Sequence, residues 1–294
     1  MTIRGRSEVE FLVTIHDRIV SRLPRIPGQG SEEAALKLLA SRKSDADPNA
    51  LIRMQHASGG WPGFLGIGPP SAFHTGLALV ALRPFQTPSV QPVAERAFGW
   101  LSVLDGLESH WLWRWKFRVF DKQVQFDPMK LGWPWVDGTV SWVAPTALSI
   151  LAFRSWRQDS DRVPIAVEML LDRACLRGGW NAGNSVAFGI ELSPHPDFTA
   201  MALLALRGLA QADRPLVRAS LDYLARRLDG SQSLYSLAWA VMALSAYSHE
   251  GASRLRQQLE KAVTTQADIG STRVLALAAL ALEDPPYTFQ EVIP

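Results

Sequence analysis

Apolar residues recur with helical spacing along most of the chain, in two kinds of segment that alternate. In the first kind, such as residues 217–228, apolar positions fall on one helical face and charged residues on the other. This pattern predicts outer helices that face water on one side. The second kind is rich in alanine and apolar all round, which is typical of helices packed on every side. We expect such inner helices at residues 146–153, 199–209, 234–247 and 272–282.

Each outer segment precedes an inner one, so the pattern predicts roughly six helical hairpins. Prolines and glycines mark the links, because proline has a fixed φ and no N–H to continue a helix. No stretch has the composition of an interdomain linker. The sequence therefore predicts an all-α fold with a single domain over residues 1–294, in which outer helices surround a ring of inner ones. The expected pairs are 8–23 with 31–42, 47–56 with 71–83, 90–105 with 142–154, 161–175 with 197–210, 214–228 with 232–248, and 252–266 with 271–283.

One aromatic-rich segment, residues 110–140, interrupts the third hairpin. Trp111, Trp113 and Trp115 alternate with other residues, a spacing that favours a strand. A connection of this length is unusual within a hairpin, which makes the segment a candidate lid or rim. Large aromatic residues also commonly serve packing, so the same residues are alternatively expected to plug one end of the core.

A short phrase recurs before two of the inner helices. Gly59-Gly60-Trp61 leads to a helix that opens on Thr75, and Gly178-Gly179-Trp180 leads to one that opens on Thr199. A unit of this size cannot bury its own apolar face, so repeated units must stack against one another.

Charge and composition narrow the possible functions. The chain has 30 basic and 28 acidic residues, and its only dense cationic stretch is 114–118, so we expect no nucleic-acid partner. A single cysteine, Cys175, excludes an internal disulfide framework and favours a reducing compartment. No apolar run reaches the ~20 residues that cross a bilayer, and the N-terminal residues lack the pattern of a signal peptide. We expect a cytoplasmic protein, with contact to a membrane surface through Trp111, Trp113 and Trp115 as an option.

The repeated phrase resembles a known motif. Gln55-x3-Gly59-x-Trp61 matches the QW motif of squalene and oxidosqualene cyclases, and Gly178-x-Trp180 repeats its second half, with Ala174 in place of the glutamine. Over residues 45–283 the chain is similar to the squalene-cyclase and protein-prenyltransferase superfamily, which implies an α/α toroid. The resemblance also implies a structural role for Gln55 and Trp61, which would tie adjacent hairpins together.

One inner-helix start differs from the others. Each of three inner helices opens on a threonine. The residue two positions before it is Phe73, Ala144 and, in the third repeat, Asp197. Asp197-Phe198-Thr199-Ala200 resembles the acid motif Asp-x-Asp-Asp-Thr-Ala of bacterial class II triterpene cyclases, although His195 and Phe198 replace its outer acids. The resemblance implies that Asp197 protonates an alkene or epoxide. An aspartate shortly before a helix is also a preferred N-cap, and this alternative stays open.

Acid-initiated cyclisation needs a carboxylic acid that stays protonated and a cavity whose aromatic faces stabilise a carbocation. His195 is a candidate partner of Asp197, and Asp137 is a second candidate acid, although Asp-Gly is also a common turn. No metal or cofactor is expected. The candidate substrate-binding residues are Phe73, Trp135, Trp142, Phe198, Tyr235 and Trp239.

Three functions remain open at this point. The first is a class II terpene cyclase-like enzyme that cyclises an apolar isoprenoid inside the ring. Class II cyclases of this family usually place their active site between two such domains, so a homodimer or partner chain would supply the other wall. The second is a non-catalytic toroid that binds an apolar ligand or a protein. The third is a prenyl-diphosphate transferase, although no Asp-x-Cys pair supplies that family's zinc ligands.

Overall fold

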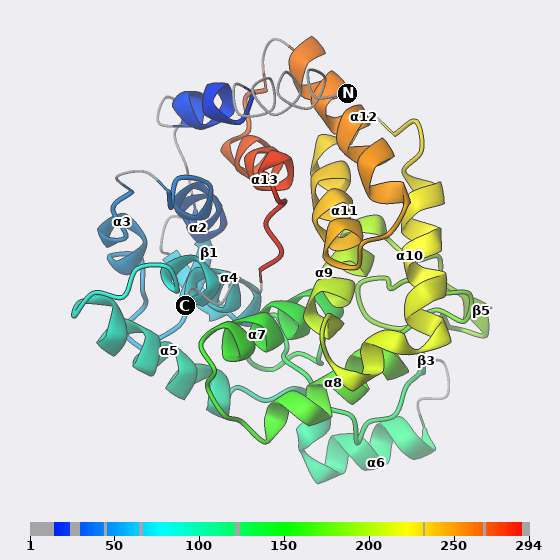
Figure 1. Cartoon of the computed structure of the whole chain (residues 1–294). Coiled ribbons are helices and arrows are strands. Elements are labelled where there is room, and N and C mark those ends of the chain that lie inside the picture. Colours follow the sequence, from blue (N-terminus) through cyan, green and yellow to red (C-terminus); the bar gives the residue numbers. More distant parts are fainter. Residues whose placement is uncertain are drawn as a thin grey trace.

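Six inner helices form a closed ring at the centre of the structure. The structure is a computed structural model that describes residues 15–23, 30–43, 46–64, 67–120, 124–231, 233–266 and 269–289. Each inner helix of this part of the chain packs against the next, and the last packs against the first (Figure 1). The all-α toroid that the alternating pattern predicts is confirmed. The inner helices are α2 (Ser31–Ala40), α4 (Ala72–Leu82), α7 (Val143–Ser155), α9 (Pro196–Leu206), α11 (Leu234–Ala246) and α13 (Thr272–Leu282).

Amphipathic outer helices cover this ring, and they bury one apolar face against it. The observed bounds of these helices agree with the expected bounds to within a few residues, with one exception. The pattern predicts a helix at 47–56, but the observed helix there is only one turn long. There the Leu51 carbonyl accepts a bond from Trp61 Nε1 at 2.8 Å, and the chain turns into the loop before Trp61. Residues 8–14 lie outside the described part. The outer helices are residues 15–22, α3 (Asn49–Ile52), α5 (Val90–Val103), α8 (Arg162–Asp172), α10 (Pro215–Arg227) and α12 (Gly251–Thr265).

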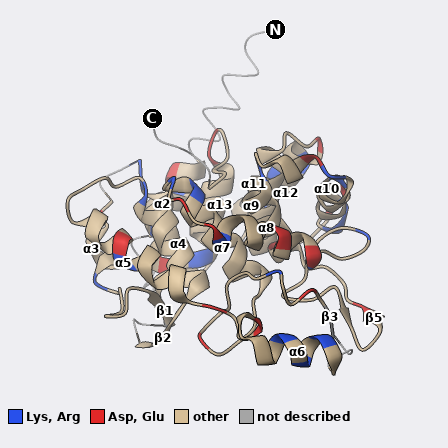
Figure 2. Ribbon diagram, turned by 90° about the horizontal axis from the view of Figure 1, so that it is seen from below, with Lys and Arg blue, Asp and Glu red and all other residues tan. Residues whose placement is uncertain are grey.

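Short antiparallel strands lie at the end of the ring where the inner helices begin (Figure 2). β1 (Trp61–Phe64) pairs with β2 (Ile67–Ser71), which leads directly into α4. A second small sheet has the order β3 (Val124–Gln125), β4 (Val186–Ala187) and β5 (Ile190–Glu191). The helical periodicity did not predict these strands. The described residues also include the 3₁₀ turns η2 (Leu107–Ser109) and η3 (Ala210–Asp213).

The expected strand around Trp111 is wrong, because residues Trp111–Val119 form an α-helix, α6. The alternating tryptophans also satisfy helical spacing. Trp113 and Phe117, four residues apart, are half-buried, whereas Trp111 and Trp115 are exposed. The His110 side chain accepts a hydrogen bond from the Leu112 backbone N–H at 3.3 Å and caps the helix.

The tryptophan phrase occurs three times in the structure, because Gly132-Trp133 before Thr146 is a third copy that the sequence analysis missed. The backbone N–H of Trp61, Trp133 and Trp180 donates to Oγ1 of Thr75, Thr146 and Thr199, at 2.9 Å in each copy. Each buried indole Nε1 donates to a leucine carbonyl of an outer helix, Leu51, Leu101 or Leu170. A Cβ on the glycine before each tryptophan would crowd the same threonine hydroxyl, at 3.0 Å in the first copy, 3.1 Å in the last and closer still in the middle one. In the first and last copies it would also collide with the Cβ of Pro70 or Pro194, so the position favours glycine.

Gln55 connects neighbouring outer helices. Its Nε2 donates to the Gly59 carbonyl at 2.7 Å and to the Val93 carbonyl of α5 at 2.9 Å. Its Oε1 accepts from Arg96. These bonds hold the turn before Trp61 against the next hairpin, which is a structural role.

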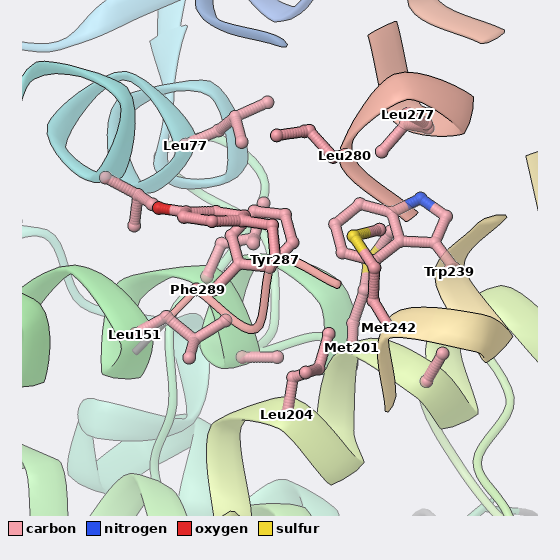
Figure 3. Close-up of a cluster of buried hydrophobic side chains, with 14 of the residues drawn as sticks. Leu77, Leu151, Met201, Leu204, Trp239, Met242, Leu277, Leu280, Tyr287 and Phe289 are labelled. Carbon is pink, nitrogen blue, oxygen red and sulfur yellow. The ribbon is translucent and has the colours of Figure 1, made fainter. Parts of the chain in front are cut away.

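The centre of the ring is filled by side chains. After α13 the chain turns back toward the ring centre, where Tyr287 and Phe289 are buried among residues of the inner helices (Figure 3). Phe289 stacks on Trp239 of α11, with ring centroids 5.1 Å apart and planes 17° from parallel. The ring therefore has a packed core.

Candidate functional site

A pocket of about 340 Å³ lies at the end of the ring where the inner helices begin. We call it the mouth pocket. Its volume falls within the ~300–1,000 Å³ typical of small-molecule sites. Five of the residues predicted from sequence line it, namely Phe73, Trp135, Asp197, Phe198 and Tyr235. The remaining lining residues are Glu32, His74, Met201 and Arg273.

Met201 lies between the mouth pocket and the core of the ring. It lines the pocket and also belongs to the buried cluster with Trp239 and Phe289 (Figure 3). Tyr235, another lining residue, packs edge-on against Trp239 with ring centroids 6.5 Å apart. The packed core is thus the floor of the mouth pocket.

Aromatic faces form much of the pocket wall. Phe73 stacks on Trp135 with centroids 4.9 Å apart, and the Trp135 carbonyl accepts a bond from the Ala72 backbone N–H that fixes the loop against α4. The Phe198 ring meets His195 edge-on at 5.7 Å. Such faces are suited to apolar or cationic groups of a ligand.

Asp197 occupies the first turn of α9, and it is not the N-cap. The N-cap is His195, Pro196 begins the helix, and the His195 side chain makes no capping bond. Oδ1 of Asp197 is buried and has no hydrogen-bond partner among the described residues. The N-cap alternative for Asp197 is therefore wrong, and its carboxyl keeps a buried oxygen without a hydrogen-bond partner in this part of the chain.

Burial is the main influence on the carboxyl of Asp197. It raises the pKa of Asp197, while a hydrogen bond from Ser236 and the charge of His195 act in the opposite direction. The carboxyl consequently keeps its proton to a higher pH than an exposed aspartate. This is the direction that a proton donor requires.

Four further predicted residues lie outside the mouth pocket lining. His195 is exposed, and Asp137 lies in an exposed turn where its Oδ1 accepts a bond from the Gly138 N–H at 2.9 Å. Trp142 lies against Gly183, in the loop between α8 and α9. Trp239 is buried in the core beneath the pocket, where it stacks on Phe289. His195 and Trp239 therefore contact the lining residues Phe198 and Tyr235 from outside the pocket, whereas no contact among the described residues places Asp137 or Trp142 beside Asp197.

Three titratable residues of the pocket were missed by the sequence analysis. Glu32 of α2 accepts a bond from Arg273 of α13 at 3.1 Å, and the Arg273 guanidinium lies 5.3 Å from the centroid of the Tyr235 ring. Burial raises the pKa of Glu32, and Arg273 opposes this shift. Burial lowers the pKa of His74 to about 4, so His74 is neutral at physiological pH. Only ring closure brings residues 32 and 273 together, and local sequence carries no signal for it.

A larger pocket, of about 590 Å³, lies between helix 15–22, α2 and α3. Its lining includes Val20, Leu38 and Met54, and it contains none of the residues predicted from sequence. Its lining residues Gly30 and Ala46 adjoin, in the sequence, segments outside the described part of the chain. We therefore assign the candidate site to the mouth pocket, whose lining combines Asp197 with four aromatic residues.

Among the described residues, no group of three or more His, Cys, Asp or Glu side chains is placed to hold a metal ion. Cys175 is buried, and its Sγ donates to the Leu192 carbonyl at 3.4 Å. Within the same described residues, no helix is long and apolar enough to cross a membrane.

No protein-family model and no curated protein matches the chain. Solved structures give distant likenesses in shape. Two are structures of Escherichia coli alpha-2-macroglobulin. The native conformation has a TM-score of 0.47 and 13% identity over 92% of this chain and 17% of that one. The fragment from domain MG7 to the C-terminus has a TM-score of 0.48 and 14% identity over 92% and 42%.

A third likeness is to haptocorrin in complex with Cbi, with a TM-score of 0.46 and 12% identity over 96% of this chain and 67% of that one. The chain spans less than half the length of either alpha-2-macroglobulin chain. These values are too low to support a functional argument. The toroid rests instead on the contacts among its own inner helices.

Proposed function

We propose that the protein binds an apolar isoprenoid in the mouth pocket and that Asp197 donates a proton to it, in the manner of a class II terpene cyclase. The observation that carries the proposal is that Asp197, whose buried Oδ1 has no hydrogen-bond partner among the described residues, lines the same pocket as Phe198, Tyr235 and Trp135. Transfer of the carboxyl proton to an alkene carbon would leave a carboxylate and a carbocation. The aromatic faces would stabilise that cation. Loss of a proton from the cyclised cation would end the reaction.

The proposed site differs from the one expected from the sequence resemblance. Tyr287 and Phe289 occupy the ring centre, where the sequence analysis places the substrate. We therefore propose the mouth pocket as the binding site, with Met201 and Tyr235 at its floor. Under this proposal a homodimer or a partner chain supplies a further wall of the pocket.

The test is a product assay with farnesol, geranylgeraniol and squalene, comparing the parent with Asp197→Asn. Asp137→Asn is the matched control, because Asp137 lies in an exposed turn. We expect the parent and the control to form cyclic or hydrated products and Asp197→Asn to lose about 100-fold or more of this activity. Equal turnover by all three proteins would remove Asp197 from the mechanism.

The second candidate is a non-catalytic toroid that binds an apolar ligand, and the packed ring centre favours it. A filled core leaves less enclosed space to keep water from a carbocation. Under this alternative the parent binds farnesol, detected as quenching of tryptophan fluorescence, without forming products. No observation specifically favours the prenyl-diphosphate transferase, and we do not propose it further.

A further inference from the structure

α6 presents an unusual apolar surface to solvent. None of its residues is buried, although five of the ten from Trp111 to Phe120 are aromatic. Trp111 is 71% exposed, Trp115 52% and Phe120 66%. We call the exposed apolar side chains the α6 face. They are Trp111, Leu112, Trp115, Val119 and Phe120.

The opposite side of α6 holds the helix against the protein. Trp113 and Phe117 are half-buried, and Phe117 packs against Phe126 with ring centroids 5.2 Å apart. Arg114 donates from Nε to the Glu108 carbonyl at 2.7 Å. These contacts attach the helix to the protein through one side, and in the described part of the chain no element covers its exposed apolar side. Of the three tryptophans expected to touch a membrane, Trp113 faces inward.

Basic residues lie on both sides of the tryptophan stripe within the α6 face. Lys116 and Arg118 are exposed, and at 100° per residue they fall on either side of the stripe that Trp111, Trp115 and Val119 form. The sequence from 110 to 120 contains no acidic residue (Figure 2). Indole rings next to cations are the groups found where helices lie in the interface of anionic membranes.

A second exposed apolar group lies close to α6. β3 follows α6 in the chain and pairs with β4, and the hairpin of β4 and β5 exposes Phe188 by 71% and Ile190 by 67%. Figure 2 shows α6 and this small sheet at the end of the ring where the inner helices begin, which is also the end of the mouth pocket.

We propose that the α6 face is a docking surface for an anionic lipid bilayer, with α6 lying in the plane of the interface. Trp111, Trp115 and Phe120 enter the headgroup region, and Lys116 and Arg118 bind lipid phosphates. The charge pattern favours lipid over a protein partner, because cations border the apolar stripe on both sides. The proposal does not depend on which ligand the mouth pocket takes.

The test is flotation with vesicles of phosphatidylcholine, with and without about one-third phosphatidylglycerol. The variants are Trp111→Ser/Trp115→Ser and Lys116→Glu/Arg118→Glu. Their controls are Ile165→Ser, an exposed apolar residue of α8, and Arg157→Glu/Arg218→Glu, two exposed arginines outside α6. All substituted residues are exposed, so the fold should be retained, which circular dichroism checks.

We expect the parent and both controls to float with anionic vesicles, and each α6 variant to bind about tenfold more weakly or worse. Binding of the parent should weaken in about 1 M salt. Brominated lipid should quench the tryptophan fluorescence of the parent, and this quenching should be weaker in Trp111→Ser/Trp115→Ser. The proposal would be overturned if the parent did not bind vesicles. It would also be overturned if the α6 variants bound them as well as the controls do. A parent dimer that only the tryptophan variant dissociates, without vesicle binding, would assign the face to a second copy instead.

Discussion

Two opposing effects act on the Asp197 carboxyl. Burial favours the protonated form, whereas the first turn of a helix favours a negative charge because the backbone N–H groups point toward it. The pKa of Asp197 is raised, so burial outweighs the charges and hydrogen bond around it. The proposed proton donor depends on this balance.

The first prediction concerns the pH dependence that follows. The pKa of Asp197 in the native state lies above the unfolded value of about 3.9, so the native state binds the proton more tightly. The free energy of unfolding should therefore fall as pH rises from about 3.9 through the native pKa. Urea unfolding across this range should show the fall in the parent and not in Asp197→Asn, and carbon-13 NMR should place the pKa of Asp197 above 3.9. A pKa at or below that value would contradict the proposed role.

At the residue scale, the sequence predicted Asp197 because it departs from a repeat, where Phe73 and Ala144 stand at the equivalent positions. Phe73, Phe198 and Tyr235 could be predicted because they lie near inner-helix starts, which meet at one end of the ring, and Trp135 because it belongs to the aromatic-rich insertion. Glu32 and Arg273 could not be, because their contact exists only when the first and last inner helices pack together.

At the scale of elements, the bond between a threonine hydroxyl and a tryptophan N–H links each of three loops to the inner helix that follows. The third copy escaped sequence analysis because Lys130-Leu131-Gly132-Trp133 keeps only the glycine directly before the tryptophan. That glycine, and not the earlier one, faces the threonine hydroxyl in each copy.

The second prediction is that Thr146→Val destabilises the protein by about 1–3 kcal/mol, because it leaves the buried Trp133 N–H without a partner. Valine keeps the shape of threonine, so packing changes little. Thr87→Val, in an exposed turn, is the control and should change stability by less than about 0.5 kcal/mol. Urea unfolding measures both, and equal effects would argue against a role for the bond.

α6 shows why an alternating pattern misled the sequence analysis. Tryptophans two residues apart satisfy a strand, but Trp111 with Trp115 and Trp113 with Phe117 satisfy a helix equally well. The helix is favoured for two reasons. His110 caps its first turn, and only the side that carries Trp113 packs against the protein. Short segments that expose large apolar residues cannot be assigned from periodicity alone.

At the scale of the whole molecule, Glu283 helps to close the ring. Arg42 of the α2 end donates to both its carboxylate oxygens, at 2.6 and 2.8 Å, and Lys43 donates at 2.9 Å. Arg256 of α12 donates to the Glu283 carbonyl. Burial alone would raise the pKa of Glu283, but the neighbouring His16 ring, 3.7 Å from Oε1, and the hydrogen bonds from Arg42 and Lys43 lower it to about 2.

The third prediction is that Glu283→Gln costs about 3 kcal/mol at neutral pH, because it leaves buried Arg42 without its carboxylate. A depressed native pKa means that this stabilisation is present above about 4.5 and is lost as pH falls toward 2. Thermal or urea unfolding of the parent should therefore show a loss in this range that the variant lacks. Asp137→Asn serves as the exposed control.

The packed ring centre could not be predicted from sequence. Tyr287 and Phe289 follow the last inner helix in an ordinary-looking segment, and their contacts with Trp239 depend on the chain turning back into the ring. Periodicity predicts that inner helices surround an axis, but it carries no information about what fills that axis.

The most direct test of the account is a crystal structure of the protein with farnesol. We predict ligand density in the mouth pocket, between Trp135 and Phe198 and within contact distance of Asp197, with Tyr287 and Phe289 still in the ring centre. Density in the ring centre with Phe289 displaced, or an empty mouth pocket at saturating farnesol, would contradict it.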